Sequence, residues 1–311
     1  MSLKKSFVSL CIPVYNGEKY LKQAIDSILS QTFQRFEVII SDNASTDQTE
    51  KICRQYMKKD DRISYHRNKN NIGGSRNHNC LVKLASGEYF KWTAHDDILA
   101  PEYLEKCVNV LDNDPSIILC HSLVNRINEK GIIDGNYDDR KLSKISSSKP
   151  HERFSDLIYD RNTCWSIHGV IRTDFLKKTK LHGSYLGADR NFLAEIGLLG
   201  RMFEIQKHLF LRRDHPSAYT NIYYSKRKQI RNYRTQLSWW KGKNQKINPF
   251  IMIPTLKLFF ELIKVVNRSI LRYSEKLLCY REITRWLLSE GFKQIKHDLI
   301  YEFKFWRTKI T

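Results

Sequence analysis

The sequence lacks a hydrophobic segment long enough to cross a membrane as a helix. No stretch approaches the roughly 18 consecutive apolar residues that such a span needs. The pattern of a secretory signal peptide is also absent, because the short apolar run near the N-terminus turns polar at Asn16. We therefore expect a chain that acts in the cytoplasm without spanning the membrane.

Paired cysteines are lacking as well. The seven cysteines are odd in number and widely spaced, and none forms a C-x-x-C pair. This argues against a disulfide framework or a zinc site and for free thiols in a reducing compartment. Cys11 and Cys120 lie inside apolar runs, where cysteine acts as a small core residue.

Two glycine-rich patterns that bind nucleotide phosphates are missing. No G-x-G-x-x-G follows the first predicted strand, and no G-x-x-x-x-G-K-S/T occurs anywhere in the chain. The first absence disfavours a nicotinamide-dependent enzyme of the dinucleotide-binding type, and the second disfavours P-loop hydrolysis of nucleoside triphosphates.

Acidic residues are scarce relative to basic ones. The chain has 53 Lys and Arg but only 33 Asp and Glu, a net charge of +20. Residues 226–311 hold 20 basic and 6 acidic residues, so they carry +14 and residues 1–225 carry +6. A basic region of this kind favours an anionic membrane surface, a nucleic acid or an acidic polymer as partner. A solvated, lysine-rich helical surface is the simpler alternative.

The apolar residues of the C-terminal region follow helical spacing. No recognisable nucleic-acid-binding module accompanies the charge, so we expect no nucleic-acid partner. Amphipathic helices could contact a membrane surface, pack on the rest of the chain or form a homodimer contact. The two stripes are Phe259, Leu262, Ile263, Val266 and Ile270, and Leu299, Ile300, Phe303 and Trp306.

Short apolar runs alternate with helical patterns over the first 125 residues. This alternation predicts an α/β fold with a doubly wound, mostly parallel sheet. Right-handed crossovers then place the loops 14–18, 41–47 and 94–97 at the carboxyl edge of that sheet. The predicted strands are residues 7–14, 36–41, 63–66, 89–93 and 117–121, and the predicted helices begin near residues 20, 48, 75 and 101.

The pattern is less regular beyond residue 125. Residues 125–150 are polar and rich in lysine and serine, which predicts a long flexible loop that closes over a substrate. We expect a strand over residues 165–171, a helix over residues 192–199 and a strand leaving the core over residues 210–216.

Two adjacent carboxylates, Asp96 and Asp97, directly follow the apolar strand 89–93, and a helix opens at Pro101. Acids at the end of a parallel strand can hold a divalent cation against a phosphate. The alternative is a pair that caps the following helix or faces water. The position after a buried strand favours the binding site.

Three further side chains fit a nucleotide at the same edge. Asp42 follows the second strand and could accept the N–H of a uracil or thymine ring, and Tyr15 could stack on that base. Arg76 stands behind the glycines of residues 71–75, at a predicted helix N-terminus that suits a phosphate. The structural alternatives are a helix cap for Asp42 and a packing role for Tyr15.

These motifs resemble the inverting glycosyltransferases of family two, which have the GT-A fold. The resemblance is strong over residues 5–125 and weakens through residues 160–220. It is carried by residues 9–17 (SLCIPVYNG), 31–33 (QTF), 36–47 (FEVIISDNASTD), 71–73 (NIG) with Arg76-Asn77, 86–89 (SGEY) and Asp96-Asp97.

The resemblance implies a nucleotide-sugar donor and Mg²⁺ or Mn²⁺ as cofactor. His95 stands where many relatives have a fuller D-x-D, which is a departure from the family pattern. The late His215 resembles a histidine that helps to hold the metal or the diphosphate. By the same resemblance Asp97 would bind the metal, and the residues that would surround the nucleotide sugar are Pro13, Val14, Tyr15, Asn16, Glu18, Asp42, Arg76 and Asp96.

Inverting transfer also needs a general base that takes a proton from the acceptor hydroxyl. The family places this acid at the start of a helix, and Asp189 resembles it, although Ala188 stands where many relatives have Glu. A plain helix N-cap is the rival interpretation of Asp189. Glu195 lies further along the same predicted helix, and we interpret it as a partly exposed helix charge.

We therefore expect a catalytic domain over residues 1–225 and a basic amphipathic helical extension over residues 226–311. Residues 1–125 would bind the nucleotide and residues 126–225 the acceptor. A UDP- or dTDP-sugar is favoured as donor and a glycan or lipid-linked acceptor as partner, in surface polysaccharide or glycolipid synthesis near the inner face of the membrane. The alternative is a non-catalytic module that binds a membrane surface or a polymer.

Overall fold

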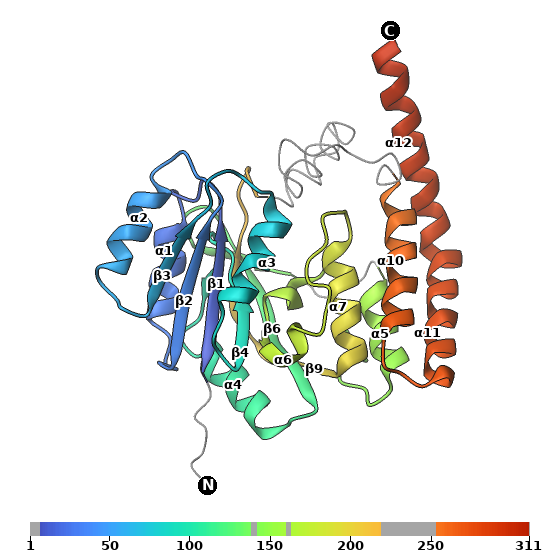
Figure 1. Ribbon diagram of the computed structural model, residues 1–311, viewed down its shortest axis with the longest axis horizontal. Coiled ribbons are helices and arrows are strands. Elements are labelled where there is room, and N and C mark those ends of the chain that lie inside the picture. Colours follow the sequence, from blue (N-terminus) through green and yellow to red (C-terminus); the bar gives the residue numbers. More distant parts are fainter. Residues whose placement is uncertain (1–6, 138–141, 160–162, 219–252, 311) are drawn as a thin grey trace.

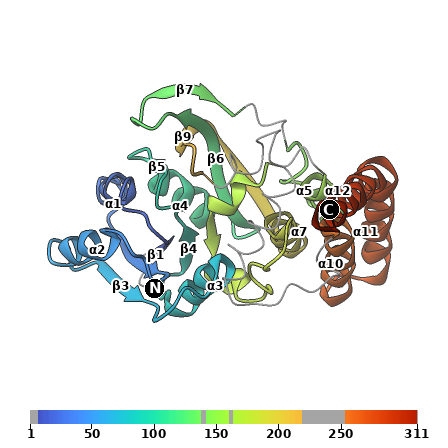
Figure 2. The ribbon, with the colours of Figure 1, turned by 90° about the horizontal axis from the view of Figure 1, so that it is seen from above.

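The computed structural model describes residues 7–137, 142–159, 163–218 and 253–310 (Figure 1). A sheet with helices packed on it forms one part of the molecule, and three C-terminal helices stand beside it (Figure 2). The proposed domain boundary at residue 225 lies outside the described residues, so the division stays a prediction.

The first half is a parallel sheet wound with helices, as the alternation predicted. The strands are paired in the order β3-β2-β1-β4 and all run in the same direction. Apolar residues are continuous in the two central strands because helices cover both faces of this sheet. The elements are β1 (Val8–Val14), α1 (Leu21–Leu29), β2 (Phe36–Asp42), α2 (Thr49–Met57), β3 (Ile63–Arg67), α3 (Gly74–Leu84) and β4 (Tyr89–Trp92).

The second half extends the sheet in the order β4-β8-β6-β9-β5, with β7 paired to β6. β8 is antiparallel to β4 and β6, whereas β6 and β9 are parallel to each other. The predicted α/β class with a helical C-terminal extension is confirmed. The elements are β5 (Ile98–Leu99), α4 (Tyr103–Asn113), β6 (Ile117–Ile127), β7 (Ile133–Asn136), α5 (Pro150–Ile158), β8 (Val170–Arg172), α6 (Thr173–Leu176), α7 (Ala188–Leu199) and β9 (Arg201–Arg213).

The prediction of an irregular loop over residues 125–150 is wrong for part of that stretch. β6 continues to Ile127, β7 returns beside it as an antiparallel hairpin, and α5 begins at Pro150. β7 is largely exposed on both faces, so its sequence has no apolar alternation that would mark it as a strand.

The predicted strand over residues 165–171 divides into two elements. Residues Trp165–His168 form a 3₁₀ turn, and the strand β8 begins only at Val170. Gly169 separates them, and a Cβ atom there would stand 2.8 Å from the carbonyl oxygen of Cys120. The close approach of the two backbones requires glycine, and the turn and the strand appear as one apolar run in the sequence.

The C-terminal region folds into α10 (Pro254–Arg268), α11 (Tyr273–Trp286), a π-helical turn (Leu287–Gly291) and α12 (Phe292–Ile310). α10 packs on α7, and α11 packs on α5 (Figure 2). Their buried residues join the same hydrophobic cluster as those of α5 and α7. Among the described residues, no helix has the combined length and apolar character that a bilayer crossing requires.

We expect Leu262→Ala to destabilise the sheet-containing part together with the C-terminal helices, by about 2–5 kcal/mol. Leu262 is fully buried in α10 and belongs to the shared cluster, so its truncation leaves a cavity where the two parts meet. Urea unfolding followed by tryptophan fluorescence would measure the loss. The matched control is Phe260→Ala, because Phe260 lies on the same helix but is 46% exposed. A separate early transition that removes α10–α12 alone would contradict a common core.

Candidate active site

The loops that follow β1, β2 and β4 meet at the carboxyl edge of the sheet. Val14 and Asp42, the last residues of β1 and β2, are paired in register. The Asn43 N–H donates to the Val14 carbonyl (2.8 Å), and the Thr93 N–H donates to the Cys11 carbonyl (2.8 Å). The predicted convergence of the three loops is therefore present in the fold.

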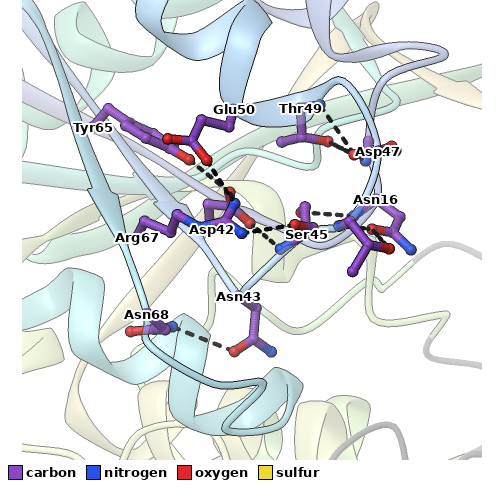
Figure 3. A network of polar contacts seen from close by, with 12 residues as sticks. Asn16, Asp42, Asn43, Ser45, Asp47, Thr49, Glu50, Tyr65, Arg67 and Asn68 are labelled. Atoms are coloured by element: carbon purple, nitrogen blue, oxygen red, sulfur yellow. Dashed lines mark hydrogen bonds and ion pairs between the residues drawn. The ribbon is translucent and has the colours of Figure 1, made fainter.

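The loop after β1 is held by hydrogen bonds to the loop after β2 (Figure 3). Asn16 adopts a left-handed backbone conformation with φ of 53°, which asparagine tolerates better than most residues. Its N–H donates to Ser45 Oγ (2.9 Å), and its side-chain oxygen accepts the Thr46 N–H (2.9 Å). The Glu18 carboxylate accepts the Gln48 N–H (2.9 Å). These contacts give Asn16 and Glu18 a role in shaping the loop, and their contact with a nucleoside stays a prediction.

The other predicted site residues of this segment, Pro13, Val14 and Tyr15, lie at the same carboxyl edge of the sheet. Pro13 and Val14 are buried at the end of β1, and Tyr15 is half-buried just beyond them. A Cβ atom on Gly17 would stand 2.5 Å from Val14 and 2.9 Å from His95. Glycine thus lets the loop after β1 lie directly against the loop that carries the acidic pair.

Asp42 is fully buried, and both of its carboxylate oxygens are engaged (Figure 3). One oxygen accepts the Ser45 N–H (2.8 Å), and the other accepts the Tyr65 hydroxyl (2.6 Å) and an Arg67 guanidinium N–H (2.8 Å). The contact with Ser45 fixes the loop after β2 and does not cap α2, whose N-cap is Gln48, so the helix-cap alternative for Asp42 is wrong. A base that used Asp42 would compete with Tyr65 and Arg67, so the contact with a base stays a prediction.

Asn43, which the sequence reasoning missed, links the loop after β2 to the start of α3. Its side-chain oxygen accepts the Ile72 N–H (2.9 Å), and its amide group donates to Asn71 (3.0 Å). Gly73 precedes α3 with φ of 88°, a conformation that favours glycine. Arg76 follows in the first turn of α3 and is exposed. The start of α3 and Arg76 therefore lie beside the carboxyl edge of the sheet.

The acidic pair lies between β4 and β5, against the end of β9. His215 Nε2 lies 3.0 Å from an Asp96 carboxylate oxygen, and an Asp97 carboxylate oxygen accepts the main-chain N–H of Arg213 (2.9 Å). The Arg213 guanidinium donates instead to the carbonyls of Asp96 (2.8 Å) and Glu129 (3.0 Å). The structure thus places His215 beside Asp96, and its role at a metal or a diphosphate stays a prediction.

The two acids have opposite electrostatic surroundings. Burial, followed by the neighbouring Asp96 charge, raises the pKa of Asp97 above its usual range. Burial also acts to raise the pKa of Asp96, but His95 and His215 outweigh it and lower that pKa. A cation added beside two neighbouring buried carboxylates would stabilise their ionised forms.

These residues fit a divalent metal ion in part. No group of three or more potential ligands among His, Cys, Asp and Glu stands ready in the described part of the chain. Mg²⁺ commonly uses one or two carboxylates and completes its shell with substrate phosphates and water. Carboxylate oxygens and water also suit Mn²⁺. Asp97, with Asp96 and His215 beside it, is such a partial set.

Asp189 occupies the first turn of α7, after Gly187 with φ of 81°. Its side chain is 37% exposed, so a substrate can reach it, and its carboxylate is hydrogen-bonded to Nε2 of the buried His182. The Asn79 side-chain oxygen accepts the main-chain N–H of His182 (3.0 Å). Nδ1 of the His182 ring lies 3.3 Å from Ser75 Oγ. The arrangement orients an accessible carboxylate through a buried imidazole.

The interaction with His182 is the largest influence that favours the ionised form of Asp189. Burial acts to raise the pKa of Asp189, but the interaction with His182 outweighs it, and the pKa lies below the ordinary value. Burial lowers the pKa of His78 to about 3 and that of His168 to about 4, so both of these nearby rings are neutral at pH 7. Asp189 is therefore ionised at neutral pH and able to accept a proton.

His168 lies beside the end of β4 and is influenced electrostatically by Asp189 and by Asp96. Its Nδ1 lies 3.3 Å from the Trp92 carbonyl, at the end of β4. Burial and then the Lys91 ammonium lower its pKa, while the carboxylates of Asp189 and Asp96 both act to raise it. The carboxylates of Asp189 and Asp96 thus both influence the His168 imidazole.

Glu195 differs from its predicted environment. It is 7% exposed and pairs with Arg268 of α10 (2.8 Å). This partner could not be predicted from local sequence patterns, because Arg268 lies 73 residues away. Glu195 therefore joins α7 to the C-terminal helices and lies outside the catalytic set.

The family model for glycosyl transferase family 2 matches residues 9–182 of the chain. A relative described as an uncharacterised glycosyltransferase of Rickettsia prowazekii is 34% identical over 168 residues, which cover 53% of this chain and 47% of the relative. Another, from Methanocaldococcus jannaschii, is 28% identical and covers 79% of this chain and 83% of the relative. The chain thus matches about half the length of the Rickettsia relative.

Solved structures share the fold. The TarS chain of S. aureus in complex with UDP has a TM-score of 0.55 at 18% identity, and the match covers 93% of this chain and 91% of that chain. The mannosyltransferase PcManGT of Pyrobaculum calidifontis, in complex with GDP-Man and Mn²⁺, has a TM-score of 0.50 at 15% identity, with coverage of 96% and 85%. The family match spans more than half of the residues and includes the three loops at the carboxyl edge, and so the chain belongs to glycosyl transferase family 2.

Proposed function

We propose that this glycosyltransferase is an inverting enzyme that moves a sugar from a nucleotide-diphosphate sugar to an acceptor hydroxyl. A UDP- or dTDP-sugar is the favoured donor, and a glycan or lipid-linked acceptor in surface polysaccharide or glycolipid synthesis is the favoured partner. The observation that carries the proposal is the meeting of the loops after β1, β2 and β4 at one sheet edge, where Asp96 and Asp97 lie against His215 and the main chain of Arg213.

In the proposed reaction the Asp189 carboxylate accepts the proton of the acceptor hydroxyl. The hydroxyl oxygen attacks the anomeric carbon as the bond from that carbon to the diphosphate breaks, and the bonding electrons leave with the nucleoside diphosphate. Attack opposite the leaving group inverts the configuration in one displacement. His182 holds the carboxylate in place and favours its ionised form.

Asp97, with Asp96 and His215, would hold Mg²⁺ or Mn²⁺ against the diphosphate. When bound, such an ion neutralises the charge that develops on the leaving group. The structural neighbours support a nucleotide-sugar donor, since one is described with UDP-GlcNAc and another with GDP-Man and Mn²⁺. Arg76, exposed in the first turn of α3, is proposed to lie beside the same nucleotide.

A thermal-shift comparison of donors tests the proposal. We expect a UDP- or dTDP-sugar to raise the melting temperature in the presence of MnCl₂ and to have little effect in EDTA. A ligand at about 100 times its Kd stabilises the fold by about 2.7 kcal/mol. GDP-mannose and NAD serve as comparison ligands. Stabilisation by NAD would overturn the assignment. So would the absence of any stabilisation by a nucleotide sugar, with or without metal.

A further inference from the structure

The last helices of the chain form one long element. α11, the π-helical turn and α12 follow one another without a break over 38 residues, from Tyr273 to Ile310. At 1.5 Å per residue this helix is about 57 Å long. One of its faces is buried by Cys279, Ile283 and Trp286, which pack in the cluster shared with α5, α7 and α10. The element is therefore anchored to the body of the protein along its inner face.

The opposite face exposes large apolar side chains. They are separated by 4, 7 or 11 residues, which is the spacing of one helix face. Exposed apolar groups gathered in this way mark a surface that binds something. We call this the outer face, and its members are Tyr273 (76% exposed), Leu277 (49%), Leu288 (68%), Phe292 (56%), Leu299 (49%) and Phe303 (71%).

Cationic side chains accompany the apolar ones. Lys293 and Lys296 are exposed beside Phe292 and Leu299. Arg281 and Arg285 have side chains that are 51% and 58% exposed and lie over the buried Glu282. The outer face therefore combines apolar and positively charged groups.

The acidic side chains of the same helix whose exposure the structure describes are buried or only partly exposed. Glu275 lies 3.0 Å from His151 of α5, and Asp298 accepts the N–H of Thr255 at the start of α10 (2.9 Å). Glu282 is 6% exposed, and Glu290 is only partly exposed. Among the side chains of residues 273–303 whose exposure the structure describes, the exposed ones include cations but no acid. The segregation of charge fits a negatively charged partner.

We propose that the outer face binds the surface of an anionic lipid bilayer. Apolar side chains can enter the boundary between headgroups and acyl chains while Lys and Arg remain at the anionic headgroups, as in helices that lie in the interface plane. A second copy of the chain fits less well. In a twofold contact the same face meets itself, and Arg and Lys would face like charges, with no exposed acid among the described side chains of residues 273–303 to pair with.

Flotation of the full chain with lipid vesicles tests this inference. We expect the protein to float with vesicles of phosphatidylcholine and phosphatidylglycerol and to remain behind with phosphatidylcholine alone. Raising the salt to about 1 M, where the screening length is about 3 Å, should weaken the binding. Failure to bind the anionic vesicles at low salt would overturn the proposal.

A double variant separates the outer face from the basic segment that precedes it. Residues 226–246 carry eight basic and no acidic residues and lie outside the described residues. Leu288→Glu with Phe292→Glu leaves that segment intact and should weaken vesicle binding by about 100-fold or more, because it removes two apolar insertions and adds two negative charges. Unchanged binding would assign the interaction to another part of the chain and contradict the proposal.

A second double variant and a matched control complete the test. Lys293→Gln with Lys296→Gln should weaken binding to anionic vesicles by about 30-fold, the value expected for two basic residues at such a surface. The control Leu84→Glu makes the same kind of change at a residue that is 41% exposed at the end of α3, and it should bind like the parent protein. Its loss of binding would contradict a role specific to the outer face.

Two further measurements exclude the alternatives. An equal melting temperature for the parent and the Leu288/Phe292 variant shows that the fold is retained, and an equal shift with a UDP-sugar shows that the donor site is independent of the outer face. Light scattering tests the alternative of a dimer. If the parent protein does not float and is dimeric, and the Leu288/Phe292 variant is monomeric, the outer face binds a second copy instead.

Discussion

Replacement of Asp189 by asparagine is expected to lower kcat for sugar transfer by about 1,000-fold, within the range of about 10²–10⁴ that a positioned general base supplies. Asparagine has nearly the same shape and can still meet His182, but it cannot accept the proton of the acceptor hydroxyl. Because Asp189 contacts the acceptor in the proposed reaction, donor binding should be nearly unchanged. Steady-state kinetics with the donor found by thermal shift would measure both quantities.

The dependence on pH gives a second measure of the role of Asp189. Its pKa lies below the ordinary value, so the midpoint of the acid limb of the kcat profile should lie below the usual carboxyl pKa of about 3.9. His182→Gln removes the imidazole that favours the ionised form. The pKa of Asp189 should then rise, and the acid limb of the kcat profile should move to higher pH. A merely structural histidine would lower kcat without moving that limb.

Glu195→Gln is the matched control for Asp189→Asn. Both acids lie on α7, but Glu195 is buried against Arg268 of α10. Its neutralisation should lower stability, since it leaves a partly buried arginine unpaired, while kcat per folded molecule stays within a few-fold of the parent. Equal losses of kcat in the two variants would show that α7 as a whole, and not the Asp189 carboxylate, supports turnover.

The parallel half of the sheet could be predicted closely because its signals are local. β1 and β2 are continuous apolar runs that end in polar loops, and the crossover rule then brings the loop ends together. The acidic pair follows β4 in the sequence, so its place at the carboxyl edge needed no knowledge of distant contacts. The hairpin of β6 and β7 could not be predicted in the same way, since β7 is exposed and buries no apolar face.

The partners of the site residues were harder to predict, because they come from distant parts of the chain. Arg213 reaches Asp97 across 116 residues, and His215 reaches Asp96 across 119. His182 lies only seven residues before Asp189, but no spacing pattern joins a loop residue to the first turn of the next helix. Asn43 was overlooked beside Asp42, although the adjacent polar residues after a buried strand were the available signal. Local motifs thus located the site, and tertiary contacts decided how each group is held.

Asp97→Asn is expected to abolish the dependence of donor binding on metal and to lower kcat/KM by about 1,000-fold. A bound ion stabilises a departing phosphate by several kcal/mol, and each 1.36 kcal/mol corresponds to about tenfold in rate. The amide oxygen can still accept the Arg213 N–H, so the local fold should persist. In thermal-shift assays the donor should give the same small shift with MnCl₂ and with EDTA.

The stability of the same variant without ligands separates a metal site from a structural acid. Asp97 is buried beside Asp96, and two adjacent carboxylates in a buried site repel each other. The metal-free Asp97→Asn protein should therefore melt at the same temperature as the parent or above it, a gain in stability at the expense of activity that is typical of functional sites. Asp61→Asn, at an exposed turn before β3, should change neither the melting temperature nor the response to metal. A large loss of stability in metal-free Asp97→Asn would show that Asp97 serves the fold through Arg213, and the case for a metal at this position would then fail.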